Sequence, residues 1–330
     1  MQISRRLFLC LGAGVVALPA FTQPANAHAY PSRPITMVVP FAPGGAFDVL
    51  GRIFAPVLSD HLGRQVIVEN VGGAGGMTGV SRVARSPADG YQFVLGDAST
   101  FAINQTFYKK PLYNAATDFE PVTLIAEVPQ VLGARRDLPL RTLREFNAYT
   151  RSNQAKMQFG SAGPGTGGHL TCALLNTAID VNVTHVPYRG AAPALQDLVG
   201  GQIDYVCTPA PTAISQIEGG VLNPVAILTK YRSPSLPALA SAHEQGLLDL
   251  EASNWGAFFF PKGMPANIVQ RLHDATLAAL NNAAVRERLK EVGADPIASE
   301  RRSPDLLAKF VLNEIQKWAG PIKASGVSAD

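Results

Sequence analysis

The sequence predicts an α/β fold of two lobes, each a mostly parallel sheet flanked by helices. Short β-branched runs alternate with helix-like stretches over residues 35–95, and the same alternation restarts over residues 142–228. After residue 250 a strand and three helices follow in a different pattern. Strands that alternate with helices form parallel sheets covered on both faces. A first lobe that resumes after an inserted second lobe is the plan of a hinged two-lobe binding protein.

The first lobe begins with three strands and two helices. The glycine pair Gly44-Gly45 ends the first strand, and a glycine-rich run over residues 72–76 ends the second. Pro56 lies inside the first helix and should kink it. The expected elements are, in order, strand 35–40, helix 46–61, strand 65–69, a helix ending near Arg85 and strand 91–95.

Two extended apolar runs around Pro129, between residues 122 and 135, should carry the chain into the second lobe. The expected elements of that lobe are helix 142–152, strand 157–160, helix 168–178, strand 183–186, helix 191–198, strand 204–207, helix 213–218 and strand 224–228.

The chain then returns to the first lobe. We expect a strand at 255–261 and helices at 265–281, 285–292 and 303–319. The last helix has a defined start, with Ser303 as the N-cap and Pro304 at the first helical position. The predicted division is therefore residues 28–130 plus 250–330 for the first lobe and 131–249 for the second. The two or three crossings between them should act as a hinge.

The N-terminus is typical of an export signal. Arg5 and Arg6 precede an uncharged apolar stretch over residues 7–21, and Ala25-Asn26-Ala27 offers a small-residue cleavage site. Residues 1–27 are therefore predicted to be a signal peptide, and the protein is predicted to reach the periplasm. The Arg pair is compatible with either the Sec route or the twin-arginine route.

Charge and cysteine content exclude several functions. Loss of Arg5 and Arg6 would lower the formal charge from +3 to +1, which gives no reason to expect nucleic-acid binding. The six histidines lack H-E-x-x-H spacing and C-x-x-C is absent, so no metal site and no cofactor are predicted. Cys172 and Cys207 could form a disulfide in an oxidising compartment. Two free buried thiols are the favoured expectation, because one cysteine lies on a predicted helix and the other on a predicted strand.

Four loops that follow strands are the candidate binding elements. They cover residues 41–48, 96–100, 161–169 and 186–190. Ligands of open parallel sheets bind outside the carboxyl ends of the strands. A glycine-rich loop at a helix N-terminus offers free N–H groups and a favourable dipole to an anion. Two such loops, one in each lobe, could hold the two ends of a small diacid or amino acid.

With these loops in place, the chain resembles the substrate-binding proteins of the tripartite tricarboxylate transporter family, also called Bug receptors. The resemblance runs from Tyr30 to about Ser325. The motifs that carry it are, in the first lobe, Pro31-Ser32-Arg33-Pro34-Ile35, Val39-Pro40-Phe41-Ala42-Pro43-Gly44-Gly45, Val68-Glu69-Asn70 and Asp89-Gly90-Tyr91, and in the second lobe Ser161-Ala162-Gly163, Gly165-Thr166, His169-Leu170 and His185-Val186-Pro187-Tyr188-Arg189-Gly190.

The resemblance implies a Venus-flytrap fold, no catalysis and a small carboxylate ligand, which could be a di- or tricarboxylate, an aromatic acid or an acidic amino acid. In such receptors the first lobe holds a carboxylate, partly through ordered waters, and the second lobe recognises the rest of the ligand. The implied partners are the membrane subunits of the transporter, and the receptor itself is expected to be a monomer. The ligand-binding residues carried over are Phe41, Ala42, Pro43, Gly44, Gly45, Asp48, Ser99, Asn104, Ser161, Thr166, His169, Tyr188 and Asp204.

Three of these residues also have a purely structural interpretation. Asp48 could brace the start of a helix, His169 could cap or pack at a helix start, and Asp204 could simply begin a strand.

Two other functions compete with uptake. The run Gly163-Pro164-Gly165-Thr166-Gly167-Gly168 fits the dinucleotide pattern G-x-G-x-x-G and would suggest an exported NAD(P)-dependent enzyme. The next strand, however, lacks the acidic residue that should hold the ribose. A sensor that signals to a membrane histidine kinase would need the same fold and site, so the sequence does not separate it from a transport receptor.

Overall fold

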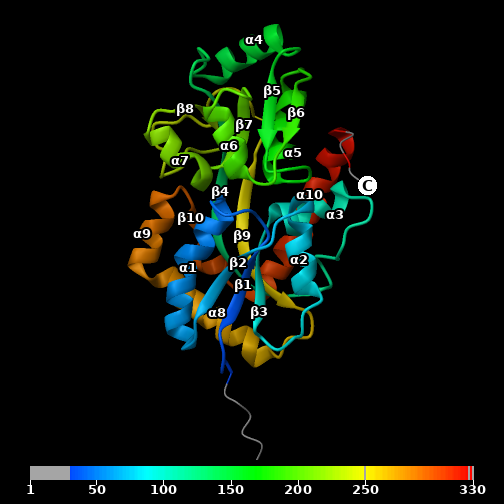
Figure 1. The fold of residues 1–330 in the computed structure, drawn as a ribbon, viewed down its shortest axis with the longest axis vertical. Helices are drawn as coiled ribbons and strands as arrows, with labels where there is room; N and C mark the ends of the chain where they lie inside the picture. The colour runs from blue at the N-terminus through cyan, green and yellow to red at the C-terminus, as the bar shows by residue number, and fades with distance from the viewer. Residues whose placement is uncertain (1–29, 249, 326–327, 329–330) are drawn as a thin grey trace, which may run out of the picture.

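The computed structural model describes residues 30–248, 250–325 and 328, so the predicted signal peptide, residues 1–27, lies outside the described part. The molecule has two lobes stacked along its long axis (Figure 1). One long strand, β4 (Phe119–Arg135), runs through both lobes and pairs with strands of each. No helix within the described residues is long and apolar enough to cross a membrane.

The lower lobe in Figure 1 is the first lobe of the sequence analysis, and it is built on the strand order β2-β1-β3-β9-β4. Strands β1, β2 and β3 are parallel, whereas β9 is antiparallel to both β3 and β4. The strands are β1 (Ile35–Val39), β2 (Val66–Asn70), β3 (Gln92–Asp97), β9 (Ser253–Pro261) and β10 (Asp295–Pro296). The helices are α1 (Ala46–Leu62), α2 (Met77–Ala84), α3 (Asn104–Phe107), α8 (Ala266–Asn281), α9 (Ala283–Glu291) and α10 (Pro304–Ser325), with short turns η1 (Ala74–Gly76), η2 (Ser99–Ile103) and η3 (Ser299–Arg301).

The upper lobe is the second lobe of the sequence analysis. It continues the sheet in the order β4-β7-β5-β6, with β8 on the other side of β4. Its strands are β5 (Gln158–Ser161), β6 (Thr184–Pro187), β7 (Tyr205–Pro209) and β8 (Leu222–Ile227), and its helices are α4 (Leu143–Asn153), α5 (Gly167–Ala178), α6 (Ala191–Val199) and α7 (Ala210–Glu218). The lobes have separate main cores. The lower core gathers aromatic rings around Phe93 and Phe258, and the upper core gathers around Phe146 and Tyr205.

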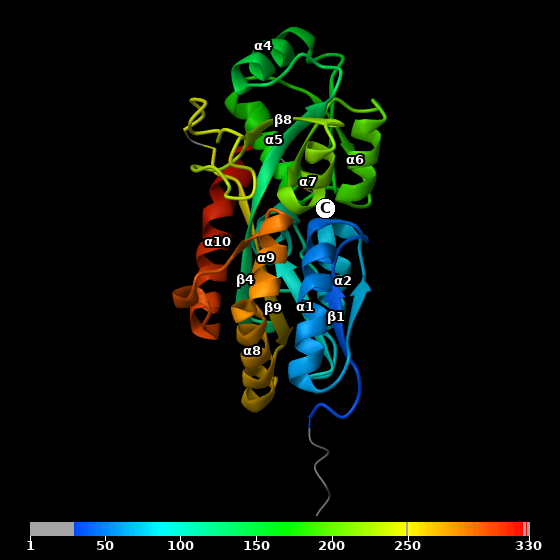
Figure 2. The ribbon, with the colours of Figure 1, turned by 90° about the vertical axis from the view of Figure 1, so that its left-hand side faces the viewer.

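Strand direction explains why the loops of the two lobes meet. Strands β3 and β4 run the same way, because β9 is antiparallel to both, and β1 is parallel to β3. Strand β7 is antiparallel to β4, and β5 and β6 are parallel to β7. The carboxyl ends of β1 and β3 therefore face the carboxyl ends of β5, β6 and β7 across the junction between the lobes. Figure 2 shows helices α1 and α2 below this junction and α6 and α7 above it.

The predicted elements are found with small shifts in their ends. The crossing near Pro129 differs from the expectation, because it is one continuous 17-residue strand instead of two runs. The last helix extends to Ser325, and Ser303 accepts a hydrogen bond from the Leu306 N–H at its start, as an N-cap does. The turn η2 and helix α3 had no counterpart in the prediction. The lobe boundaries at 130/131 and 249/250 stay a prediction.

Candidate ligand-binding site

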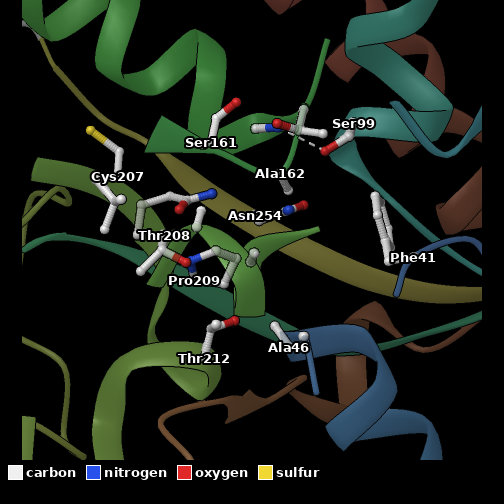
Figure 3. A pocket seen from close by; sticks show the side chains of 18 of the residues that line it. Phe41, Ala46, Ser99, Ser161, Ala162, Cys207, Thr208, Pro209, Thr212 and Asn254 are labelled. Carbon is white, nitrogen blue, oxygen red and sulfur yellow. Dashed lines mark hydrogen bonds between the residues drawn. The ribbon is translucent and has the colours of Figure 1, made fainter. Parts of the chain in front are cut away.

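A cavity lies between the lobes, at the point where the strand ends face one another. Figure 3 shows Thr208 and Pro209 on one side of it and Phe41 and Ser99 on the other. The lower lobe contributes Phe41, Gly45, Ala46, Phe47, Asp97, Ser99 and Asn254, and the upper lobe contributes Gly160, Ser161, Ala162, Thr166, Gly167, Gly168, Ala191, Ala194, Val206, Cys207, Thr208, Pro209 and Thr212. Gln130, on the crossing strand β4, completes the lining.

Four helices begin at this cavity. The first residues of α1, α5 and α6, namely Ala46, Gly167 and Ala191, line it, as does Thr212 in the first turn of α7. The first N–H groups of a helix have no intrahelical partner, and the helix dipole is positive at this end. None of the described residues that line the cavity is lysine or arginine. The cavity therefore favours an anion through backbone dipoles instead of through a cationic side chain.

The loop before α5 is held by its own side chains. Thr166 is the N-cap, and its hydroxyl donates to the Gly163 carbonyl at 2.7 Å and accepts from the His169 N–H. The Ser161 hydroxyl accepts from the Gly163 N–H at 3.1 Å. These bonds fix the start of α5, so that its positive dipole end and the Gly168 N–H are held in place at the cavity wall.

The two lobes touch around the cavity. The Gly167 N–H, at the start of α5, donates to the Ser99 hydroxyl of the lower lobe at 2.9 Å (Figure 3). A Cβ on Gly190 would lie 2.7 Å from the Cβ of Ala42, so the loops before α1 and α6 approach as closely as glycine allows. The two lobes are therefore in direct contact beside the cavity.

Comparison with known proteins places the chain in a family. Residues 50–327 match the family described as "Tripartite tricarboxylate transporter family receptor". The chain belongs to this receptor family. Among solved structures, it is 37% identical to the periplasmic binding protein BugD, with a TM-score of 0.88 over 91% of this chain and 100% of that chain.

Two further similar structures contain ligands. The first is MatC from Rhodopseudomonas palustris with bound malate, which is 35% identical with a TM-score of 0.86, over 89% of this receptor and 100% of that chain. The second is an R. palustris protein with adipate, which is 34% identical with a TM-score of 0.87, over 91% of this receptor and 99% of that chain. The predicted family and two-lobe fold are thereby confirmed.

Asp48 of the receptor lies behind the first loop and is not among the residues that line the cavity. Its carboxylate accepts hydrogen bonds from the Gly44 N–H at 2.9 Å, the Asn70 amide at 3.0 Å and Arg52. Burial alone would raise the pKa of Asp48, but these hydrogen bonds together hold it below its ordinary value. Asp48 thus braces the loop that carries Gly44 and Gly45.

His169 also lies behind the cavity wall. Its ring Nδ1 accepts from the Gly165 N–H at 3.3 Å, and the ring stacks on His185 at a centroid distance of 4.2 Å. His185 Nε2 is 2.7 Å from the Ser161 hydroxyl oxygen. Burial lowers the pKa of His169 to about 3, with a further contribution from His185, and burial lowers the pKa of His185 to about 4. Both rings are therefore neutral at neutral pH and support the loop over residues 161–165.

This histidine pair predicts a loss of stability in mild acid. Because both folded pKa values lie below the ordinary 6.5, the unfolded chain binds more protons than the folded one between about pH 6.5 and pH 4. The free energy of unfolding should fall as the pH falls through this window, by at most about 1.4 kcal/mol per pH unit for each histidine. Urea unfolding at several pH values measures this slope.

The matched variants are His185→Gln, in the pair, and His61→Gln, at an exposed position on α1. Carboxyl groups contribute to the slope in every variant, so the informative quantity is the difference from the unmodified protein. His185→Gln should flatten the slope more than His61→Gln does. Equal slopes in all three proteins would show that the pair does not titrate in this window.

Other predicted residues lie farther out. Ala42, Pro43 and Tyr188 line a groove at the outer edge of the cleft, where the Tyr188 hydroxyl donates to Asp197 at 2.7 Å. Gly44 lies beside α6. A Cβ atom added to Gly44 would be 3.5 Å from the Cβ atom of Ala192. Asn104 donates to the Gly75 carbonyl at 2.9 Å. Of the predicted set, Phe41, Gly45, Ser99, Ser161 and Thr166 line the cavity itself.

Asp204 lies away from the cavity, and its predicted ligand contact needs correction. It immediately precedes β7, whereas the carboxyl end of that strand lines the cavity. Its carboxylate accepts from the Gln158 N–H at 2.7 Å and forms an ion pair with Arg135 at 3.2 Å. The alternative interpretation, a residue that begins a strand, describes its position.

Cys172 and Cys207 form a disulfide, which corrects the expectation of two free thiols. Their Cα atoms are 5.5 Å apart, because α5 packs directly on β7. A Cβ on Gly168 would lie 2.3 Å from the Cys207 carbonyl oxygen, so only glycine permits this approach. A cysteine on a helix and one on a strand can therefore pair where the two elements touch.

The prediction missed five polar residues that line the cavity: Asp97, Gln130, Thr208, Thr212 and Asn254. Asp97 is fully buried at the end of β3 and accepts from the Thr100 hydroxyl at 2.7 Å and the Asn254 amide at 3.0 Å. Burial raises the pKa of Asp97, against the effect of these hydrogen bonds. Asp97 stood in a loop already singled out from the sequence, whereas Gln130 and Asn254 lie in crossing strands without a motif.

Proposed function

We propose that this receptor captures a small carboxylate in the periplasm and presents it to the membrane subunits of a tripartite tricarboxylate-type transporter. The observation that carries the proposal is the meeting of four helix N-termini at one buried cavity, with no lysine or arginine among the described residues that line it. Such a site stabilises a carboxylate by oriented N–H groups. The malate and adipate bound to the two R. palustris proteins support the same ligand class.

The first lobe would hold the carboxylate through the N-terminus of α1 and the loop over Phe41–Gly45, with Ser99 beside it. The second lobe would close over the ligand through Ser161, Thr166 and the N-terminus of α5. In this assignment Asp48, Asn104, His169 and Tyr188 support the loops, and their own hydrogen bonds are the basis for that role.

Opening and closing would occur about the crossings near residues 130 and 250. A ligand that contacts both lobes stabilises the closed form, because it gains contacts there that the open form lacks. The bond between the Gly167 N–H and the Ser99 hydroxyl is one contact that opening would break. The membrane subunits would then recognise the closed form.

A thermal-shift screen of the mature protein, residues 28–330, tests this function. The panel would contain mono-, di- and tricarboxylates, amino acids and NAD(P). A ligand at 100 times its dissociation constant should stabilise the fold by about 2.7 kcal/mol, which raises the melting temperature measurably. We expect a shift with carboxylates. A shift with NAD(P) alone would contradict the proposal and favour an enzyme.

A further inference from the structure

We infer that the ligand carries a hydroxyl group in addition to its carboxylate, and that Gln130, Thr208 and Thr212 recognise this hydroxyl. The inference rests on the proposed function and narrows the ligand class from carboxylates in general to hydroxycarboxylates.

The first argument is an accounting of the polar side chains that line the cavity. Gln130 Oε1, Thr208 Oγ1 and Thr212 Oγ1 are buried and have no hydrogen-bond partner. The three residues are 1%, 4% and 6% exposed, so bulk water does not solvate them. The other polar side chains of the described lining do have partners, as shown above for Ser99, Ser161, Thr166, Asp97 and Asn254. Buried polar atoms in proteins are nearly always hydrogen-bonded, so these three atoms indicate what a ligand supplies.

The second argument is position. Gln130 lies opposite Pro209 in the pairing of β4 with β7. Thr208 directly precedes Pro209, and Thr212 follows it in the first turn of α7. Figure 3 shows Thr208, Pro209 and Thr212 on the side of the cavity away from Phe41 and Ser99. The Gln130 amide also reaches the start of α5. If Gly167 carried a Cβ atom, that atom would lie 3.1 Å from Gln130 Nε2. The three residues thus lie around Pro209, near the starts of α5 and α7 that face the cavity.

The third argument is chemical complementarity. An amide oxygen needs a donor, and an ionised carboxylate has none, so a plain dicarboxylate cannot satisfy Gln130 Oε1. An ammonium group could donate to the Gln130 oxygen, but it has no lone pair with which to accept from a threonine hydroxyl. A hydroxyl can donate to the Gln130 oxygen and accept from a threonine hydroxyl at the same time. A hydroxycarboxylate therefore matches both halves of the cavity.

Titration calorimetry with acids that differ by a single hydroxyl tests the inference. The pairs are malate and succinate, 2-hydroxyglutarate and glutarate, and lactate and propionate. In the best-binding pair, we expect the hydroxy acid to bind at least about tenfold more tightly than its partner, because the partner leaves a buried acceptor unsatisfied.

The variants Gln130→Met, Thr208→Val and Thr212→Val remove the polar atoms at nearly constant volume. Each should bring the affinity ratio of the pair toward one, chiefly by weakening the hydroxy acid. Thr150→Val is the matched control, since the Thr150 hydroxyl is also buried and without a partner but is not part of the cavity lining. It should leave the ratio unchanged.

The outcomes separate this inference from the proposed function. If plain acids bind as tightly as hydroxy acids, the receptor function stands and the hydroxyl inference is overturned. A preference that survives all three cavity variants also overturns it, because other residues then recognise the hydroxyl. If no carboxylate binds, both the function and the inference fail.

Discussion

Replacement of Ala46 by aspartate is expected to weaken carboxylate binding at least about 100-fold. Ala46 is the first residue of α1, is 4% exposed and lines the cavity at the helix end that we assign to the ligand carboxylate. Two unit charges about 4 Å apart repel by about 4 kcal/mol at an effective dielectric constant of about 20. Half of that repulsion already corresponds to a roughly 30-fold loss of ligand affinity. The new side chain would also occupy space that the ligand needs.

Ala46→Asn is the matched control, because asparagine has the shape of aspartate without its charge. Calorimetry at pH 8, where the new carboxyl group is ionised, should show a much larger loss for aspartate than for asparagine. Because Ala46 is buried, urea unfolding of both variants separates a loss of binding from a loss of the fold. Equal affinities for the two variants would mean that the ligand carboxylate does not lie at the start of α1.

The sequence allowed the scaffold of the site to be predicted for a physical reason. Short apolar runs that each end in glycine mark strands followed by helix starts, as at Gly44-Gly45 before α1 and Gly167-Gly168 in α5. Strand direction then places these helix starts at the same junction, because the carboxyl ends of β1 and β5 face each other. Local patterns therefore sufficed for the elements and for the backbone part of the cavity.

The side chains that complete the cavity could not be predicted from such patterns. Gln130 and Asn254 lie on the crossing strands β4 and β9, and only the pairing of distant strands brings them to the cavity. The neighbours of each are apolar or small, so no local signal marks it. The disulfide has the same origin, because the packing of α5 on β7 is a long-range feature. Asp204 shows the opposite error, in which the family resemblance implied a ligand contact for a residue that the predicted strand 204–207 already placed at the strand start, away from the carboxyl end that lines the cavity.

Loss of the Cys172–Cys207 disulfide is expected to lower both stability and ligand affinity. The two cysteines are 35 residues apart, and closure of a loop of that length lowers the entropy of the unfolded chain by an amount worth about 3–4 kcal/mol. The bond also joins α5, whose N-terminus faces the cavity, to Cys207 in the cavity wall. Without it the N–H groups of Gly167 and Gly168 are less firmly placed, and we expect affinity for the ligand to fall about tenfold, a change of about 1.4 kcal/mol in binding free energy.

Urea unfolding and calorimetry of oxidised protein, reduced protein and the double variant Cys172→Ala/Cys207→Ala measure the two effects separately. The reduced protein and the double variant should agree, and a reductant should not change the double variant, since the segment 28–330 contains no other cysteine. A fall in stability without a fall in affinity would show that the bond restrains the unfolded chain but does not position α5. Two reactive thiols in the unfolded, unreduced mature protein would contradict the disulfide itself.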